Sequence, residues 1–212
     1  SIEILACVIW ISIEIPLTVD SIGDGAFQNC KSLTCINIPE SVINLGNEIF
    51  IGCSNVEEVS INPTIAKGQQ LNTKALTHLI IYSTSECMLS GCQIRSLFES
   101  DLNITHLVIK PSFVGIDDYF FISLITNNVK NYSTNEYLIS VEFPATMKKV
   151  NYSNLIKCTN LKEIILDPYS TAINWIIKQP STDYYGRNIE KNYAQNYFDY
   201  HLIISTNNKS IN

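Results

Sequence analysis

The sequence predicts an α/β solenoid, in which short strands from successive coils stack into one parallel sheet. The first observation is a 23-residue period that relates cysteines to one another and apolar residues to one another: Cys7, Cys30 and Cys53, with Ile4, Phe27 and Phe50 three residues earlier. A fixed period of this length is the signature of a repeat architecture. The second is a strand pattern that recurs in each unit, and the third is a proline that follows most of these strands.

Each strand is predicted from the pattern apolar-x-x-apolar-x-apolar, in which alternate side chains point into the coil. The last inward residues of the seven strands are Ile15, Ile38, Ile61, Ile81, Ile109, Phe143 and Leu166. The residues two and five positions earlier are apolar in every unit. Six of the seven prolines come one or two residues after a strand's end, where a missing N–H does least harm to the ladder. The spacing of 28 residues before Ile109 is taken as one coil with an insertion, not as two coils separated near Cys92.

The segments between the strands predict the far wall of each coil. Gly23 and Gly46 each follow an apolar wall residue, and we expect them to form turns with positive φ. The stretch from 117 to 125 predicts a short helix. One further strand around Leu202 and Ile204 fits less well, because Asp199 takes the apolar position five residues before Ile204.

Cysteines that share one position of the repeat predict a buried column of reduced thiols: Cys7, Cys30, Cys53 and Cys158. The apolar residues around that position favour a small hydrophobic side chain there. Cys87 and Cys92 lie in an irregular stretch, and their state, bridged or free, is left open.

Residues 15–39 resemble one full unit of the BspA-type leucine-rich repeats, and residues 38–63 and 143–168 resemble it closely. This resemblance implies a right-handed solenoid with the parallel sheet on its concave face and short helices, turns and loops on its convex face. It also implies adhesion or partner binding, because the family occurs in surface proteins of bacteria and protozoan parasites. We expect about seven units over residues 1–169, the first truncated and the middle ones irregular. Residues 170–212 are expected to form a divergent repeat or a C-terminal cap of the same domain.

Composition and motifs narrow the function. With 14 basic against 20 acidic residues and a net charge of −6, a nucleic-acid surface is improbable. The apolar stretch from 2 to 17 contains Glu3 and Glu14 and fits neither a spanning helix nor a secretion signal, so membrane attachment would need an anchor outside this sequence. G-x-S-x-G, H-E-x-x-H, C-x-x-C and phosphate-binding glycine motifs are all missing. We therefore expect no enzyme activity, no catalytic residue, no cofactor and no metal. A hydrolase or a metal-dependent enzyme that uses the histidines is a distant alternative.

The outward strand positions predict the ligand site, because the concave sheet of a solenoid offers an extended binding surface. Its centre is apolar with two histidines, and its flanks are polar or acidic. The predicted ligand-binding residues lie on two neighbouring strands: His78, Ile80 and Tyr82, beside His106, Val108 and Lys110. The competing interpretation is that the long loops of the 28- and 34-residue units fold over this patch.

The expected function is a non-catalytic binding module that takes a protein or a glycan as its ligand, with a role in cell-surface adhesion or protein recognition. An intracellular interaction scaffold of the same fold is the alternative. The resemblance points to the cell surface or the extracellular space, and a cytoplasmic location is left open.

Overall fold

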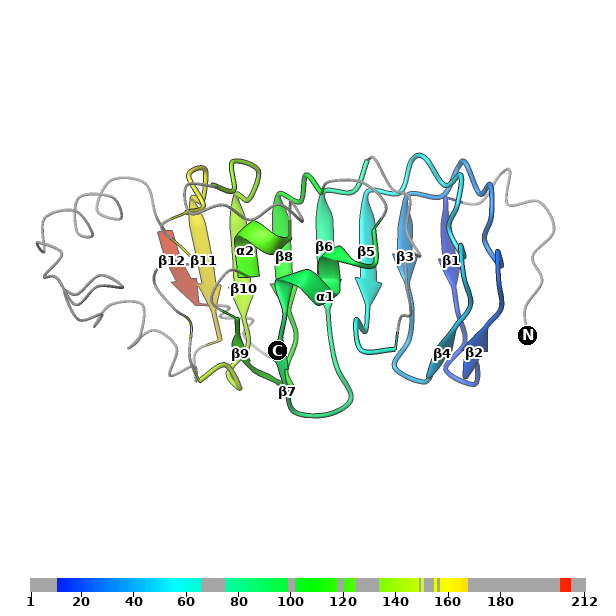
Figure 1. Cartoon of the computed structure of the whole chain (residues 1–212), viewed down its shortest axis with the longest axis horizontal. Coiled ribbons are helices and arrows are strands. Elements are labelled where there is room, and N and C mark those ends of the chain that lie inside the picture. Colours follow the sequence, from blue (N-terminus) through cyan, green and yellow to red (C-terminus); the bar gives the residue numbers. More distant parts are fainter. Residues whose placement is uncertain are drawn as a thin grey trace, which may run out of the picture.

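The structure is a computed structural model that describes residues 11–65, 75–98, 102–117, 120–124, 134–148, 150, 155, 157–167 and 203–206. Its described part contains one eight-stranded parallel sheet, whose strands stand side by side from β1 to β12 (Figure 1). The strands in spatial order are β1 (Ser12–Glu14), β3 (Cys35–Asn37), β5 (Glu58–Ile61), β6 (His78–Ile81), β8 (His106–Ile109), β10 (Ser140–Phe143), β11 (Glu163–Leu166) and β12 (Ile203–Thr206).

The sequence-based register is confirmed across the main sheet. Equivalent positions of the predicted pattern lie opposite one another in neighbouring strands, from Ile13 opposite Ile36 to Val141 opposite Ile164. The 28-residue unit is a single coil, because β6 pairs directly with β8. The 34-residue unit is also a single coil, since β8 pairs directly with β10.

The final strand lies two residues later than the sequence pattern suggested. β12 pairs with β11 so that Ile204 lies opposite Ile164 and Thr206 lies opposite Leu166. The strand therefore ends at Thr206, and Asp199 lies outside the described residues. The rest of the segment expected to form a divergent repeat or cap, and the boundary after residue 169, lie outside the described residues.

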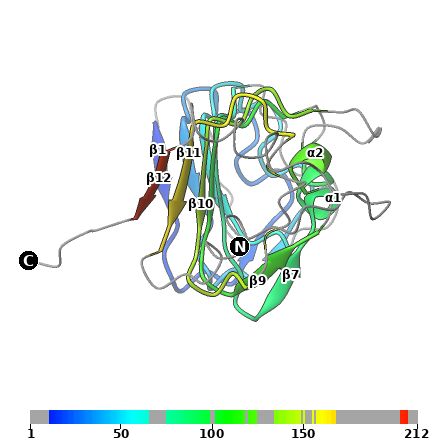
Figure 2. The ribbon, with the colours of Figure 1, turned by 90° about the vertical axis from the view of Figure 1, so that its left-hand side faces the viewer.

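The side of the coil opposite the main sheet holds the insertions. Two small parallel sheets form there, one from β2 (Ser21–Ile22) and β4 (Asn44–Leu45), the other from β7 (Cys87–Leu89) and β9 (Phe113–Ile116). Helices α1 (Gly91–Arg95) and α2 (Phe120–Ser123) lie across the coil from the main sheet (Figure 2). The helix expected over 117–125 is confirmed as α2, whereas α1 and β7 were not predicted. The helices of the described part are too short to cross a membrane.

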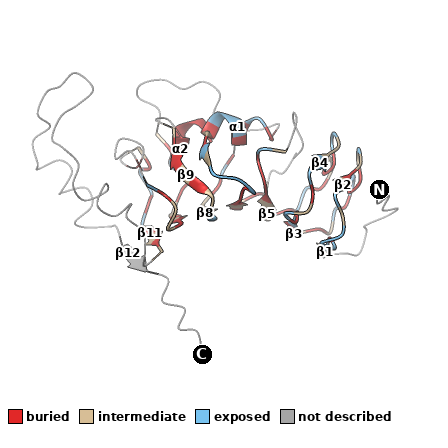
Figure 3. Ribbon diagram, turned by 90° about the horizontal axis from the view of Figure 1, so that it is seen from below, coloured by how far each residue is buried: buried red, intermediate tan, exposed pale blue. Residues whose placement is uncertain are grey.

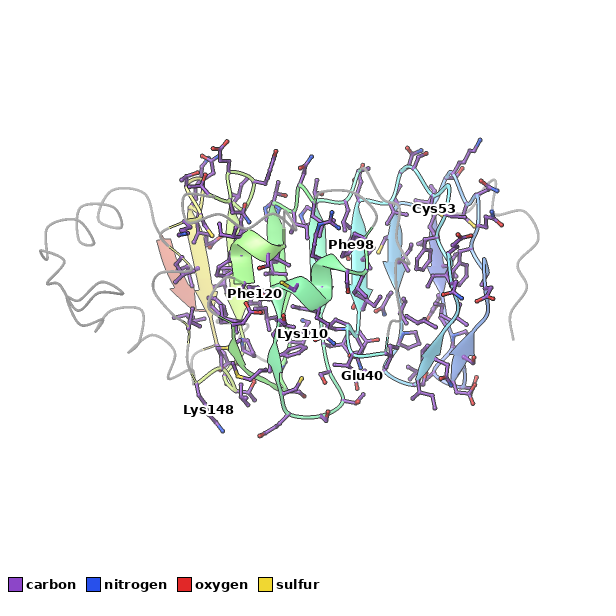
Figure 4. The ribbon with its side chains drawn as sticks, viewed as in Figure 1. Glu40, Cys53, Phe98, Lys110, Phe120 and Lys148 are labelled. Carbon is purple, nitrogen blue, oxygen red and sulfur yellow. The ribbon has the colours of Figure 1, made fainter. Side chains whose placement is uncertain are left out.

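The core fills the space between the main sheet and this far wall (Figure 3). Phe27 and Phe50 come from successive coils, and their rings stack with centroids 5.2 Å apart and planes 9° from parallel. Phe121 packs edge-on against both Phe120 and Phe143, which joins α2 to β10. Phe98 and Phe120 lie on the helical side of the coil, in front of the sheet in Figure 4. Aromatic contacts between coils therefore hold neighbouring units together.

The expectation of positive φ at Gly23 and Gly46 is wrong. Among the described glycines, positive φ occurs at Gly25 (60°) and Gly52 (77°). Gly46 is required for a different reason, because a Cβ atom there would lie 2.3 Å from the backbone nitrogen of Asp24 in the preceding coil. The turns of successive coils therefore approach too closely for any side chain at residue 46.

The cysteine column is buried as predicted, but its expected redox state is wrong at one position. Cys30, Cys53 and Cys158 are all buried. Cys53 and Cys158 are reduced, and burial raises the pKa of both thiols. Cys30, in contrast, is disulfide-bonded. Cys7, the remaining member, lies outside the described residues, and Cys87 and Cys92 are free thiols.

A buried asparagine occupies the same column in the 34-residue unit. Asn135 precedes the strand end Phe143 by eight residues, as Cys53 precedes Ile61, and it forms a parallel bridge with Cys158. Its side-chain amide donates to the carbonyl of Phe121 (2.9 Å), and its Oδ1 accepts from the backbone N–H groups of Tyr137 and Leu138 (both 3.0 Å). The column thus accepts either a small apolar thiol or an amide with three hydrogen bonds.

Candidate functional site

The face of the main sheet that points away from the helices carries two rows of outward side chains. Figure 3 shows the sheet as a shallow arc with α1 and α2 on its convex side, so these rows lie on the concave side. The first row is Ser12, Cys35, Glu58, His78, His106, Ser140 and Glu163. The second row is Glu14, Asn37, Ser60, Ile80, Val108, Glu142 and Ile165. Neighbouring members of each row come from adjacent strands in register.

Two histidines lie at the centre of the first row. His78 on β6 is directly opposite His106 on β8. Their rings are stacked with centroids 4.3 Å apart and an interplanar angle of 0°. The predicted adjacency of the two imidazoles is therefore present, and the sheet spacing itself sets their separation.

A threonine next to each histidine fixes its ring. The Nδ1 atom of His78 lies 2.9 Å from Oγ1 of Thr77, and that of His106 lies 2.8 Å from Oγ1 of Thr105. The Thr105 hydroxyl is also within donor distance of the Thr77 carbonyl (3.2 Å), and the Thr77 hydroxyl is 3.4 Å from the Glu57 carbonyl. These threonines were missed in the sequence, although each directly precedes an outward histidine at the same position of its unit.

The environment of His106 favours a neutral ring. Partial burial lowers the pKa of His106, and the positive charge that His78 would carry lowers it further. The charge of Glu163, two strands away on β11, acts in the opposite direction. The centre of the face is therefore uncharged at neutral pH on the His106 side.

The depressed pKa predicts that the protein loses stability on mild acidification. The unfolded chain binds a proton at this histidine more readily than the folded chain does, so the stability that the neutral ring contributes is complete above about pH 6.5. It is lost as the pH falls from that value through the lower pKa of the folded state. We expect the thermal midpoint to fall between pH 7.5 and pH 5, and to fall less in His106→Gln. The measurement is a melting curve followed by circular dichroism at each pH. An equal fall in wild type and His106→Gln would contradict the prediction.

The second row supplies the apolar part of the site. Ile80 and Val108 are half-buried neighbours on β6 and β8. Ser60 lies beside Ile80, and Glu142 lies beside Val108. A small apolar centre is thus bordered by polar and acidic side chains, as the sequence predicted.

One of the six predicted site residues does not belong to this surface. Tyr82 is only 5% exposed, and its hydroxyl donates to the backbone carbonyl of Ile38, two coils away. Burial, followed by the charge of Glu40, raises the pKa of Tyr82 to about 12. Lys110 is exposed and directly follows β8, and its backbone N–H still donates to the carbonyl of Ile81 at the end of β6 (Figure 4). The alternation of outward and inward side chains ends with the strand, so extending it by one residue misplaced Tyr82.

The described parts of the two insertions leave the concave face uncovered. β7, α1, β9 and α2 all lie across the coil from the main sheet (Figure 2). Residues 125–133 of the longer insertion lie outside the described residues. Within the described part, no group of three or more His, Cys, Asp or Glu side chains is arranged to hold a metal ion. The four side chains brought together are His78, His106, Ile80 and Val108.

Comparison with known proteins gives one match. The family model of the BspA type leucine rich repeat region matches the chain in six copies, over residues 6–128 and 95–177. No curated protein and no solved structure matches the chain.

Proposed function

Because the chain belongs to the BspA type leucine rich repeat family, which builds protein-interaction modules, we propose that it binds a protein partner through the concave face of its main sheet. The proposed site is the group His78, His106, Ile80 and Val108, and its role is recognition without catalysis. The observation that carries this proposal is the combination of stacked histidines and an apolar pair at the centre of a sheet that the described insertions leave open.

The charges around the site favour a basic partner. Glu58 borders His78 in the first row, and Glu142 borders Val108 in the second. Glu163 extends the acidic border by one further strand. A partner that inserts an apolar side chain at Ile80 and Val108 and surrounds it with lysines or arginines matches this arrangement. Such a border speeds association and selects partners, while the apolar contact supplies most of the affinity.

A location at the cell surface, and hence a role in adhesion, has support from the cysteines. Cys30 is disulfide-bonded, and disulfides persist mainly in oxidising environments such as the cell exterior. The reduced thiols of Cys53 and Cys158 are compatible with that environment, because both are buried and their raised pKa values suppress thiolate formation. These observations favour the surface role over an intracellular scaffold of the same fold.

The test places two charges in the apolar pair. Ile80→Glu with Val108→Glu should weaken partner binding by about 30-fold or more, the equivalent of a hot-spot loss of about 2 kcal/mol. The matched control is Leu17→Glu with Ile43→Glu, which adds the same charge at two exposed apolar residues away from the concave face. Immobilised wild-type protein, concave variant and control variant are compared for the proteins they retain, and affinities are then measured by surface plasmon resonance.

Once melting curves show that both variants fold, the binding data test the proposed site directly. A partner of the proposed site is retained by wild type and control and lost by the concave variant. Its binding should also weaken as salt is raised, because the acidic border is only half-buried and its charges are screened by salt. If every retained protein binds the concave variant as tightly as wild type, the assignment of the site is wrong.

A further inference from the structure

We propose that the concave face takes an extended, basic segment of its partner protein, in which a basic residue, an apolar residue and a second basic residue alternate with residues of any type. This inference rests on the proposed function and names the kind of partner that the site recognises. The segment lies across the strands of the main sheet, from β5 to β10. Its apolar side chain contacts the apolar pair, Ile80 and Val108, and its basic side chains pair with Glu58 and Glu142.

The two outward rows contain acidic residues but no lysine or arginine. Their glutamates are Glu14, Glu58, Glu142 and Glu163. Lys110, the basic residue nearest to the apolar pair in the sequence, directly follows β8 and lies beyond the second row on the side away from Glu58. An acidic surface attracts basic partners from solution and disfavours acidic ones. The rows therefore select a cationic segment.

The two carboxylates flank the apolar pair at equal distances along the sheet. β5, β6, β8 and β10 are consecutive strands, so Glu58 lies one strand before Ile80 and Glu142 lies one strand after Val108. Adjacent strands are about 4.8 Å apart, which places β5 and β10 about 14 Å apart with the apolar pair midway between them. Because this side of the sheet is concave, the side-chain tips lie slightly closer together than the backbones do (Figure 3).

An extended chain repeats its side chains at nearly the same interval. It rises about 3.3–3.4 Å per residue and alternate side chains point to the same side, so its first, third and fifth residues span about 13 Å. These three residues therefore reach Glu58, the apolar pair and Glu142 in turn, while the second and fourth face solvent. The pattern is symmetric, so both directions of the segment satisfy it.

Long basic side chains cover the offset between the two rows. Glu58 belongs to the first row, whereas the apolar pair and Glu142 belong to the second, about 7 Å away along the strand direction. Lysine and arginine have flexible stems, so a basic residue above the second row can extend its charge to Glu58. The Glu58 carboxylate accepts the Cys35 thiol (3.6 Å between Sγ and Oε1), and a carboxylate has further lone pairs for a second donor.

The face also offers partners to the backbone of the segment. Ser60 lies beside Ile80, and Ser140 lies beside His106, and both serines are half-buried. Their hydroxyls can donate or accept a hydrogen bond, and the imidazoles of His78 and His106 add further polar groups. A helix is about 10–12 Å across, which is wider than the separation of the two rows. This narrow strip therefore suits an extended chain better than a helix.

The test measures binding of short fluorescent peptides to the intact protein by fluorescence anisotropy at low salt. The probe is Gly-Lys-Ser-Leu-Ser-Lys-Gly. Its matched control, Gly-Lys-Leu-Ser-Ser-Lys-Gly, has the same composition and charge but turns leucine to the other side of an extended chain. We expect the probe to bind about tenfold more tightly than the control, the effect of one well-buried apolar side chain. A third peptide, Lys-Ser-Ser-Ser-Leu-Ser-Ser-Ser-Lys, places the same three side chains on one face of a helix.

Variants of the protein test the two charge pairs. Glu58→Gln and Glu142→Gln should each weaken probe binding about threefold, the effect of losing a partly exposed ion pair. Glu14→Gln is the matched control, since Glu14 lies in the second row but on β1, and it should have no effect. Lys110→Gln should strengthen binding, because it removes a like charge near the segment.

A charge exchange distinguishes direct pairing from a general loss of stability. Glu142→Lys should bind the probe more weakly than Glu142→Gln does. It should instead prefer Gly-Lys-Ser-Leu-Ser-Glu-Gly, in which one lysine of the probe is replaced by glutamate. A misfolded variant cannot produce such a reversal of preference.

The inference is overturned if the probe and its control bind equally, if the helical peptide binds more tightly than the probe, or if the probe does not bind up to about 1 mM. It is also overturned if Glu58→Gln and Glu142→Gln both leave probe binding unchanged.

These outcomes are separate from a failure of the proposed function. If partner proteins are lost by the concave variant although the probe does not bind, the proposed function stands and the extended segment is wrong. If the probe binds as expected while every retained protein still binds the concave variant, the segment site is supported and the proposed function is removed.

Discussion

Replacing Phe50 by alanine should lower the free energy of unfolding by about 3–5 kcal/mol, the range for truncating a buried aromatic side chain. Phe50 is fully buried, and its ring stacks on Phe27 of the preceding coil. The substitution removes a large apolar surface and also breaks a contact between two coils. In a solenoid each coil is stabilised mainly by its neighbours, so the loss weakens the coupling along the chain as well as the local packing.

Urea denaturation followed by circular dichroism measures this effect. Phe50→Leu fills part of the space and should cost clearly less than Phe50→Ala. Leu17→Ala is the control on the surface, because Leu17 is 78% exposed and such changes usually stay within about 0.5 kcal/mol. A Phe50→Ala protein within 1 kcal/mol of wild type, with an unchanged dependence on urea, would show that the coil interface does not carry the stability assigned to it.

Replacing Asn135 by leucine should cost about 2–4 kcal/mol, although leucine is similar in size and more apolar. Asn135 is 1% exposed, and its amide satisfies the Phe121 carbonyl together with the N–H groups of Tyr137 and Leu138. A buried polar group left without a partner costs about 1–3 kcal/mol, and three such groups are affected. The gain from burying an apolar side chain offsets only part of that cost.

Asn135→Cys offers a sharper comparison, because cysteine occupies this column in other coils. The Cys53 thiol donates to the Phe27 carbonyl, so a thiol at residue 135 can retain one of the three bonds in weaker form. We expect Asn135→Cys to be less destabilising than Asn135→Leu. Asn55→Ala is the control, since Asn55 makes a single exposed side-chain bond to the Lys31 carbonyl. Equal stability of all three variants would contradict the assigned role of the amide.

The main sheet could be predicted from the sequence because its constraint is local and repeated. Each strand carries three apolar positions, and a register shift of one residue would turn all of them to solvent. For this reason the pairing of His78 with His106 was predictable across a 28-residue unit. The stacking of their rings follows from that pairing.

Other features could not be predicted, because they depend on contacts between coils that leave no periodic signal. Residue 46 must be glycine because the backbone of Asp24 lies too close for a side chain. Tyr82 is buried because its hydroxyl donates to a backbone carbonyl two coils away. Cys30 is disulfide-bonded, although the regular spacing of the cysteine column suggested reduced thiols at every position. Asn135 carried a signal that was overlooked, since it lies 23 residues before Cys158.

The placement of the insertions has a consequence for how such a protein diversifies. Strand ends are spaced by 20, 23, 28, 34 and, between Leu166 and Thr206, 40 residues, yet every described neighbour in the main sheet is paired directly. The extra residues that the structure describes form β7, α1 and α2 on the opposite side. Insertions therefore change the side of the molecule opposite the main sheet. Point substitutions in the two outward rows change the concave face instead. A library that randomises only these rows would vary specificity on a constant frame, and peptide tags placed in the exposed turn at residues 84–86 should leave that frame intact.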